Sequence, residues 1–331
     1  MRKAPLDATS SPLAEGGTAS GVKQPTRDNA VRASRGFMFG LGAYGLWGAF
    51  PLYWPLLEPA GAIEILAHRI LWSCLTIGAV LLLFRRLPQF LALLRDHRAR
   101  ALLTLAAATI SANWFMYIWA VNNERVVEAS LGYFINPLVT VLMGIVVLGE
   151  RLRRMQWVAM SIAVVAVLVL AFDYGRPPWI AMVLACTFGT YGLSKKVADV
   201  EAVESLAFEM VLVAPFAAAY LAWLGATGAG NFTAHGSGHT LLLMTTGIVT
   251  AIPLLCFGAA AVRVSMVTMG LLQYVTPVLQ FLLGVLWFHE DMPVGRWIGF
   301  MLIWVALTVF TVEASRHRRR QLRLAATASA L

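Results

Sequence analysis

The sequence predicts an all-α integral membrane protein, with ten transmembrane helices arranged as two five-helix repeats of opposite topology. Three observations predict this fold: the composition, a succession of long apolar segments, and a spacing at which the second half repeats the first. The mean hydropathy is +0.71 and only 13% of the residues are charged, well below the roughly 25% of soluble domains. A helix needs about 20 apolar residues to cross a bilayer, where it satisfies its own backbone hydrogen bonds.

Apolar runs of this length place ten spans along the chain. With the N-terminus in the cytoplasm, 22 of the 26 Lys and Arg residues fall on that side, as the positive-inside rule requires. Because the number of spans is even, the C-terminus is also cytoplasmic, and the expected location is the plasma (inner) membrane. The basic segment 85–100 is expected to lie on the inner surface. The spans are predicted at 37–57, 62–84, 101–121, 126–149, 157–173, 179–195, 205–225, 240–261, 265–289 and 297–314.

The chain is expected to have four parts. Residues 1–36 are polar and rich in Gly, Pro, Ser and Thr, which predicts a disordered basic cytoplasmic arm. The repeats cover 37–175 and 176–314, and 315–331 form a basic cytoplasmic tail. The basic residues occur in short clusters between apolar runs, a pattern that favours membrane topology over a nucleic-acid-binding surface.

The two halves match at a constant offset of 140 residues. Each half holds five spans, an odd number, so the second half must enter the membrane in the opposite orientation. Inverted repeats of this kind occur in transporters, in which a site between the halves is exposed to each side in turn. The matching pairs are Pro137 with Pro277, Gly144 with Gly284, Glu150 with Glu290, Trp157 with Trp297, and Ala62, Glu64, Leu66 and Ala67 with Ala202, Glu204, Leu206 and Ala207.

Four segments of the first half also resemble a known family. EILAHRILW (64–72), NWFMYIWAVN (113–122), EASLGYFINPL (128–138) and LGERLRRMQW (148–157) are similar to those of RarD-type permeases, a branch of the EamA family in the drug/metabolite transporter superfamily. The resemblance implies a carrier with a central cavity lined by helices 1 to 4 and 6 to 9. It also implies that helices 5 and 10 lie at the periphery.

Span 2 carries three ionisable residues in its first turns: Glu64, His68 and Arg69. An arginine at mid-membrane costs about 3 kcal/mol on insertion scales, so it needs a partner or water. Two interpretations remain open. In one, Arg69 forms an ion pair with Glu128 of span 4 and fixes the two helices together, while Glu64 and His68 lie at the wet outer interface. In the other, Arg69 faces the cavity and binds an anionic group of the substrate.

Polar and aromatic residues of spans 3 and 4 are further candidates for the substrate cavity. The alternative is hydrogen bonding between helices, worth about 1 kcal/mol for each bond in a membrane. The matching positions of the second half are less polar, so the first half is expected to contribute more of the recognition. The candidates are Asn113, Trp114, Tyr117, Tyr133 and Asn136, with Tyr191, Gln273 and Tyr274 as weaker ones.

Residues kept in both halves are expected to serve packing and bending. Pro137 and Pro277 are predicted near the middle of spans 4 and 9, where each acts either as a hinge or as a static bend. Glu150 and Glu290 end their spans shortly before the next helix begins. A carboxylate is stabilised at a helix N-terminus, so both are predicted to be structural caps.

The function predicted from these features is a secondary carrier that moves a small metabolite or drug by alternating access through a central cavity. Glu209, the deepest carboxylate of the second half, is either a proton-coupling site or the partner of Lys195 or Lys196. The alternative function is a membrane-embedded receptor, enzyme or scaffold without net transport. No catalytic or cofactor motif occurs in the sequence, and glycines around His235 and His239 disfavour a metal pair. The oligomeric state stays open.

Overall fold

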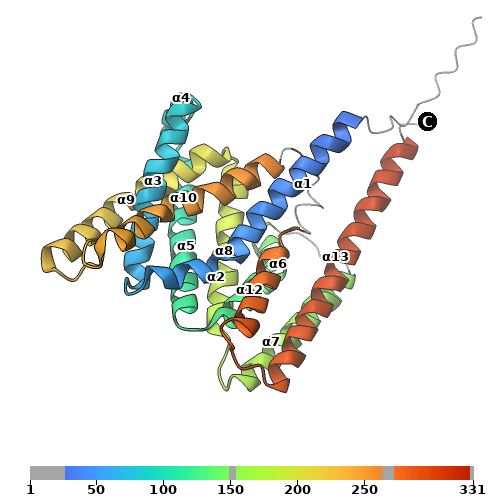
Figure 1. Cartoon of the computed structure of the whole chain (residues 1–331). Helices are drawn as coiled ribbons and strands as arrows, with labels where there is room; N and C mark the ends of the chain where they lie inside the picture. Colours follow the sequence, from blue (N-terminus) through green and yellow to red (C-terminus); the bar gives the residue numbers. More distant parts are fainter. Residues whose placement is uncertain (1–26, 149–153, 262, 264–271, 329–331) are drawn as a thin grey trace, which may run out of the picture.

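The computed structural model describes residues 27–148, 154–261, 263 and 272–328, and the regular secondary structure in these ranges is helical (Figure 1). The first half contains α1 (Arg27–Gly48), α2 (Phe50–Tyr53), the 3-10 helix η1 (Trp54–Leu57), α3 (Ala62–Leu83), α4 (Leu87–Leu93), α5 (His97–Asn122), α6 (Val126–Leu148) and α7 (Arg154–Asp173). The second half contains α8 (Trp179–Ala198), α9 (Ala202–Thr227), α10 (Gly236–Ala261), α12 (Val275–Leu286) and α13 (Val294–Ala328).

Six of the described helices contain a stretch long and apolar enough to cross a membrane: α3, α5, α7, α9, α10 and α13. Shorter apolar stretches lie in α6 and α12. Large apolar side chains point outward on these helices, such as Phe216 of α9, which is 73% exposed. Exposed apolar surface of this extent suits contact with lipid rather than water. The chain is therefore a multi-pass membrane protein.

The predicted spans agree with these helices best where an apolar run has polar borders. The span predicted at 62–84 is α3 to within one residue. The first predicted span is broken instead, because Pro51 and Pro55 start α2 and η1, and the first turn of a helix accommodates proline without the loss of a backbone hydrogen bond. Residues 27–36 of the predicted arm belong to α1, and α13 continues through most of the predicted tail to Ala328.

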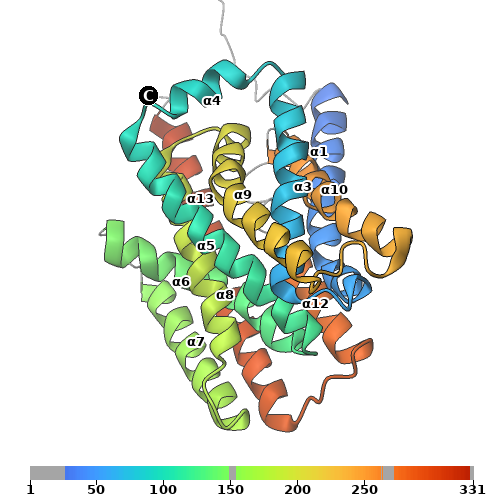
Figure 2. The same ribbon diagram turned by 90° about the vertical axis from the view of Figure 1, so that its left-hand side faces the viewer.

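The most extensive helix contacts join one half of the chain to the other. The helix α3 packs against α9 and α10, α5 against α8 and α9, α6 against α8 and α12, and α1 against α10 and α12. In Figure 2, α3, α9 and α10 lie side by side, and α7 lies at the edge of the bundle. The two remaining helices, α7 and α13, pack mainly against each other. The interior is thus built between the halves.

Two glycines permit crossings in which the helix backbones themselves come close. A Cβ at Gly247 of α10 would lie 2.5 Å from the backbone carbonyl of Trp72 on α3, and one at Gly132 of α6 would lie 2.9 Å from the carbonyl oxygen of Ala181 on α8. Nonbonded atoms do not approach so closely. Small residues at these positions let the helix backbones meet, as in other membrane helix pairs.

Candidate functional site

Arg69 lies in the interior, where four elements of the chain meet. Its side chain extends from α3 and is 3% exposed. The Nε atom donates a hydrogen bond to Thr250 Oγ1 of α10 at 3.1 Å. The guanidinium carbon lies 3.9 Å from the ring centre of Trp114 on α5 and 5.1 Å from that of Trp54. Such faces stabilise a buried cation by about 2 kcal/mol when water is excluded.

The first of the two interpretations of Arg69, an ion pair with Glu128, is wrong. Glu128, which is 2% exposed, pairs with Arg176 at 2.9 Å and accepts the backbone N–H of Ile180 at 3.2 Å. The reason is helix rotation, because Arg69 is turned toward α5 and α10 whereas Glu128 in the first turn of α6 meets the loop before α8. In the part of the chain that the structure describes, no carboxylate lies within ion-pair distance of Arg69.

Asn113 and Tyr133 form a hydrogen-bonded link between the halves near Arg69. The Asn113 amide donates to the carbonyl oxygen of Leu184 at 2.9 Å and to Thr187 Oγ1 at 3.0 Å, both on α8. Its Oδ1 accepts a hydrogen bond from the Tyr133 hydroxyl at 3.3 Å. The structural interpretation of Asn113, as a bond between helices, is therefore satisfied by these contacts.

Other predicted cavity residues differ in their surroundings. The hydroxyl of Tyr117 and the Oδ1 atom of Asn136 are buried and have no hydrogen-bond partner among the described residues. Tyr117 packs edge-on against Tyr133, with the ring centres 5.6 Å apart. Gln273 lies half-buried in the turn before α12, and Tyr274 packs against the cluster formed by α6, α7 and α13. Tyr274 therefore packs in a different apolar cluster from Trp54, which borders Arg69.

Glu64 and His68 are buried, at 4% and 3% exposure, which corrects their predicted position at a wet interface. Glu64 accepts the backbone N–H of Asn231 at 2.7 Å and its side-chain amide at 2.8 Å. The His68 ring stacks on Phe232 with the centres 4.7 Å apart. The loop before α10 thus contacts both residues through Asn231 and Phe232.

Glu209 on α9 is fully buried and paired. Lys195 of α8 lies 3.0 Å from its Oε1 atom and also donates to the Tyr191 hydroxyl at 2.9 Å. Ser205 donates to the same carboxylate at 3.1 Å, and Tyr191 donates at 3.4 Å. Of the two lysines considered as partners of Glu209, Lys195 forms the pair, and the contact joins α8 to α9.

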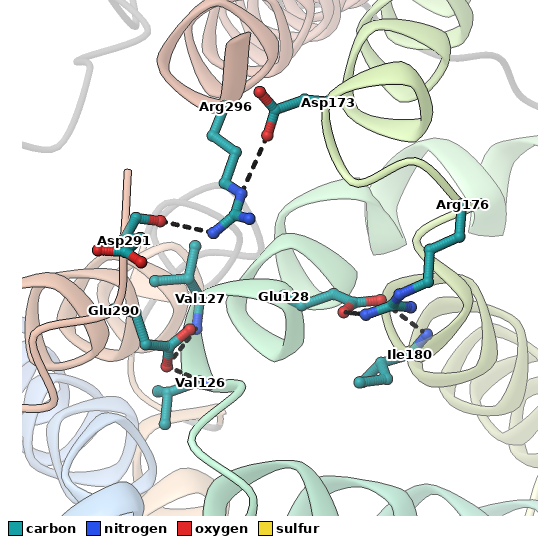
Figure 3. Close-up of polar contacts among 9 residues, drawn as sticks. All are labelled: Val126, Val127, Glu128, Asp173, Arg176, Ile180, Glu290, Asp291 and Arg296. Atoms are coloured by element: carbon teal, nitrogen blue, oxygen red, sulfur yellow. Dashed lines mark hydrogen bonds and ion pairs between the residues drawn. The ribbon is translucent and has the colours of Figure 1, made fainter. Parts of the chain in front are cut away.

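At the end where α6, α8 and α13 begin, polar contacts cross between the halves (Figure 3). Beside the Glu128 pair, Arg296 donates from Nε to Asp173 at 3.0 Å. The side chain of Glu290 points at the first turn of α6 and accepts the backbone N–H of Val127 at 3.1 Å. We name the ion pairs Glu128–Arg176 and Asp173–Arg296, together with Glu290, the polar clamp.

Glu290 and Pro277, which repeat Glu150 and Pro137 at the offset of 140 residues, differ in position from the sequence-based prediction. Glu290 lies at the N-terminus of α6, not of α13, the next helix in sequence. Pro277 lies in the first turn of α12 rather than in its middle, where the missing N–H costs no intrahelical bond. Pro137 is inside α6, as expected. Glu150 lies outside the described residues.

We predict that Glu290 makes stability depend on pH. Burial is the main cause that raises its pKa from the ordinary 4.5 to about 7, against the opposing backbone hydrogen bonds. The folded protein therefore binds this proton more tightly than the unfolded chain. The stabilisation is complete below pH 4.5 and is lost as the pH rises through 7, by on the order of 2 kcal/mol.

Thermal unfolding of the purified protein between pH 4.5 and pH 8 measures this effect. The Glu290→Gln variant should lose less stability over that interval than the wild type, because its side chain does not titrate. Parallel pH curves for the two proteins would contradict the prediction. The control variant Glu58→Gln, an exposed change outside the helices, should follow the wild-type curve.

Sequence reasoning missed several residues of these contacts. Thr250 and Trp54 around Arg69 gave no signal, because nothing in their spacing identifies which helix faces they share. Arg176 and Arg296 were detectable in principle. Arg125, Arg176 and Arg296 are the three basic residues that the proposed topology places on the outer side. Basic residues are usually enriched on the cytoplasmic side, so an arginine on the outer side suggests a carboxylate partner nearby.

The fold and the buried polar contacts together describe a multi-pass helical membrane protein whose halves meet around a buried arginine. The profile of the EamA-like transporter family matches residues 34–172. The chain is 59% identical to "Protein RarD" of Streptomyces exfoliatus over 86% of this chain and 90% of that one. It is 43% identical to "Uncharacterized transporter PA0485" of Pseudomonas aeruginosa, covering 86% and 96%.

A crystal structure with 20% sequence identity matches with a TM-score of 0.53 over 86% of this chain and 98% of the other, which is a likeness of fold. The chain belongs to the EamA-like transporter family, in its RarD-type branch. In general terms it is a drug/metabolite permease, and family and relatives alike indicate a transporter rather than an enzyme.

Proposed function

We propose that the chain is a secondary carrier built as a 5+5 inverted repeat, which moves a small metabolite or drug by alternating access. The helix contacts support the repeat. Under the exchange of α1 with α8, α3 with α9, α5 with α10, α6 with α12 and α7 with α13, most of the extensive helix contacts have a counterpart. For example, the contact of α5 with α8 becomes that of α10 with α1. Two equivalent halves can rock about a shared site.

The substrate site in this proposal is centred on Arg69. The observation that carries it is a buried guanidinium inside a membrane-spanning helix, held by aromatic rings and one hydroxyl, with no carboxylate at ion-pair distance in the described parts of the chain. An intramembrane arginine of this kind is a functional candidate. Its planar group suits a carboxylate or phosphate of the substrate.

The polar clamp is assigned to the outer side, because the proposed orientation places both termini in the cytoplasm. The supporting observation is the excess of Lys and Arg in the loops at the opposite end. Each contact of the clamp joins the two halves. Opening toward the outside would therefore require these contacts to break, while the halves separate at this end.

Glu209 is the proposed proton-coupling residue. Its buried carboxylate is neutralised by Lys195, and the pair links α8 to α9 within the second half. Protonation of Glu209 would remove the attraction that holds Lys195 and would weaken the contact of α8 with α9. In liposomes, a pH gradient should then drive substrate accumulation in the wild type. Accumulation that ignores the gradient would exclude coupling at this residue.

The experiment that tests the carrier begins with untargeted metabolite profiling of cells that lack or overproduce the protein. The compound that changes most is then offered to liposomes containing purified protein. We expect saturable uptake that protein-free liposomes lack. Saturable binding without uptake would contradict the carrier and favour the alternative, a receptor, enzyme or scaffold without net transport.

A further inference from the structure

A pocket of about 570 Å³ lies between α3, α9 and the loop that precedes α10. Its volume is in the range of small-molecule sites, roughly 300–1,000 Å³. Leu75 at its border is 63% exposed on the outer face of α3, a helix apolar enough to span the membrane, so the pocket opens toward lipid chains. Arg69 does not line it, and the pocket is separate from the site proposed above.

One end of the pocket is polar and negatively charged. Glu64 lines it and is held by the two N–H groups of Asn231, but in the described parts of the chain no basic side chain pairs with it. His68, one helical turn further, also lines the pocket, and its Nε2 atom is buried with no hydrogen-bond partner among described residues. A buried charge without an opposite charge is costly.

The second half shows what neutralises such a carboxylate. Glu204 matches Glu64 at the offset of 140 residues and is equally buried, at 3%. It pairs with Arg86 of the same chain at 3.2 Å. In place of His68 the second half has Phe208, which is buried in an apolar cluster. Glu204 is thus paired and Phe208 is apolar, whereas among the described residues Glu64 has no basic partner and His68 Nε2 has no hydrogen-bond partner.

Aromatic rings and leucines complete the pocket. Phe232 stacks on His68 and lies 6.4 Å, ring centre to ring centre, from Trp72, so aromatic faces border the polar end. Aromatic faces attract ammonium groups. The walls that continue toward the lipid are apolar and suit a hydrocarbon chain. They are formed by Leu71, Leu75, Leu221 and Leu224.

We propose that this pocket binds a cationic amphiphile that enters from the bilayer. The ammonium group of the ligand pairs with Glu64 and lies near the aromatic faces of Phe232 and Trp72. An N–H of the same ammonium group can also donate to His68 Nε2. The apolar part of the ligand lies between the leucines. An anionic amphiphile would meet the Glu64 carboxylate and be repelled. The proposal depends on the pocket and not on the carrier function, because binding requires no transport.

The test uses the full chain in detergent micelles and the fluorescent amine monodansylcadaverine, with its N-acetylated, uncharged derivative as the matched ligand. We expect saturable binding of the amine and about tenfold weaker binding of the acetylated probe, as for loss of one charged hydrogen bond. Glu64→Gln should weaken amine binding about tenfold and abolish the preference for the amine. Glu204→Gln is the control and should bind like the wild type.

A second variant covers the case in which Glu64→Gln does not fold. Leu75→Trp fills the pocket from the lipid face without touching the Glu64 contacts, and should also weaken amine binding. Leu82→Trp, a similarly exposed change on the same helix, should not. Equal affinities for the two probes, nonsaturable uptake by micelles alone, or unchanged binding in Leu75→Trp would overturn the proposal. Because no flux is measured, these outcomes leave the carrier proposal unaffected.

Discussion

Replacing Arg69 with methionine is expected to abolish substrate uptake while the protein remains folded and at least as stable as the wild type. The guanidinium is buried without a carboxylate at ion-pair distance among the described residues. Methionine has a similar length and no charge to desolvate, and such replacements of buried charges are often neutral or stabilising. A bound anionic group would lose its partner, which costs at least about 100-fold in transport.

This combination of outcomes separates the two interpretations of Arg69. A structural arginine would lower the unfolding temperature when removed, and uptake would fall only in proportion to the folded protein. Uptake into liposomes and thermal unfolding of the same preparation measure the two quantities together. Arg95→Met, an exposed change in the loop before α5, is the matched control. Full uptake by Arg69→Met would remove this residue from the substrate site.

Thr250→Val examines the only side-chain hydrogen bond described for Arg69. Valine keeps the shape of threonine but cannot accept the Nε–H, so the guanidinium remains in place through its aromatic contacts. We infer a smaller loss of uptake than for Arg69→Met. Uptake should fall less in Thr250→Val than in Arg69→Met, because Thr250 only orients the guanidinium, whereas Arg69 itself would contact the substrate.

The sequence predicts helices well where one apolar run lies between polar residues. The first span shows the limit, because its apolar character continues to residue 57 while Pro51 and Pro55 interrupt the helix. Hydropathy measures the preference for lipid, not the continuity of the backbone. The family resemblance came from short motifs, and the relatives confirm it over most of the chain.

The candidate site was harder to predict, because partners depend on how helices rotate and cross. The sequence offered Glu128 of span 4 as a partner for Arg69, but Glu128 pairs with Arg176 instead. An apolar segment with a few ionisable residues contains no information on how its helix is rotated relative to its neighbours. Likewise, Glu290 was assigned to the next helix in sequence, whereas contacts between the halves bring it to α6.

The second large effect is expected at the crossing of α3 and α10, where Gly247→Ala should destabilise the protein by about 3 kcal/mol. The added Cβ would lie 2.5 Å from both the carbonyl carbon and the oxygen of Trp72. Backbone atoms in a helix cannot rotate away as a side chain does, so the two helices must separate. Overpacking of this kind typically costs 1–3 kcal/mol, and the rigid neighbour places this case at the upper end.

Separation of these helices should also impair transport. Thr250 lies one turn beyond Gly247 on α10 and holds Arg69 of α3 across the same crossing. Gly78→Ala is the matched control, because a Cβ at Gly78 of α3 would meet no atom within 4 Å and alanine favours the helix. The two alanine variants should therefore shift the unfolding temperature in opposite directions. Equal stability of both would mean that α3 and α10 can move apart freely, and Arg69 would then lack the fixed surroundings on which its proposed role depends.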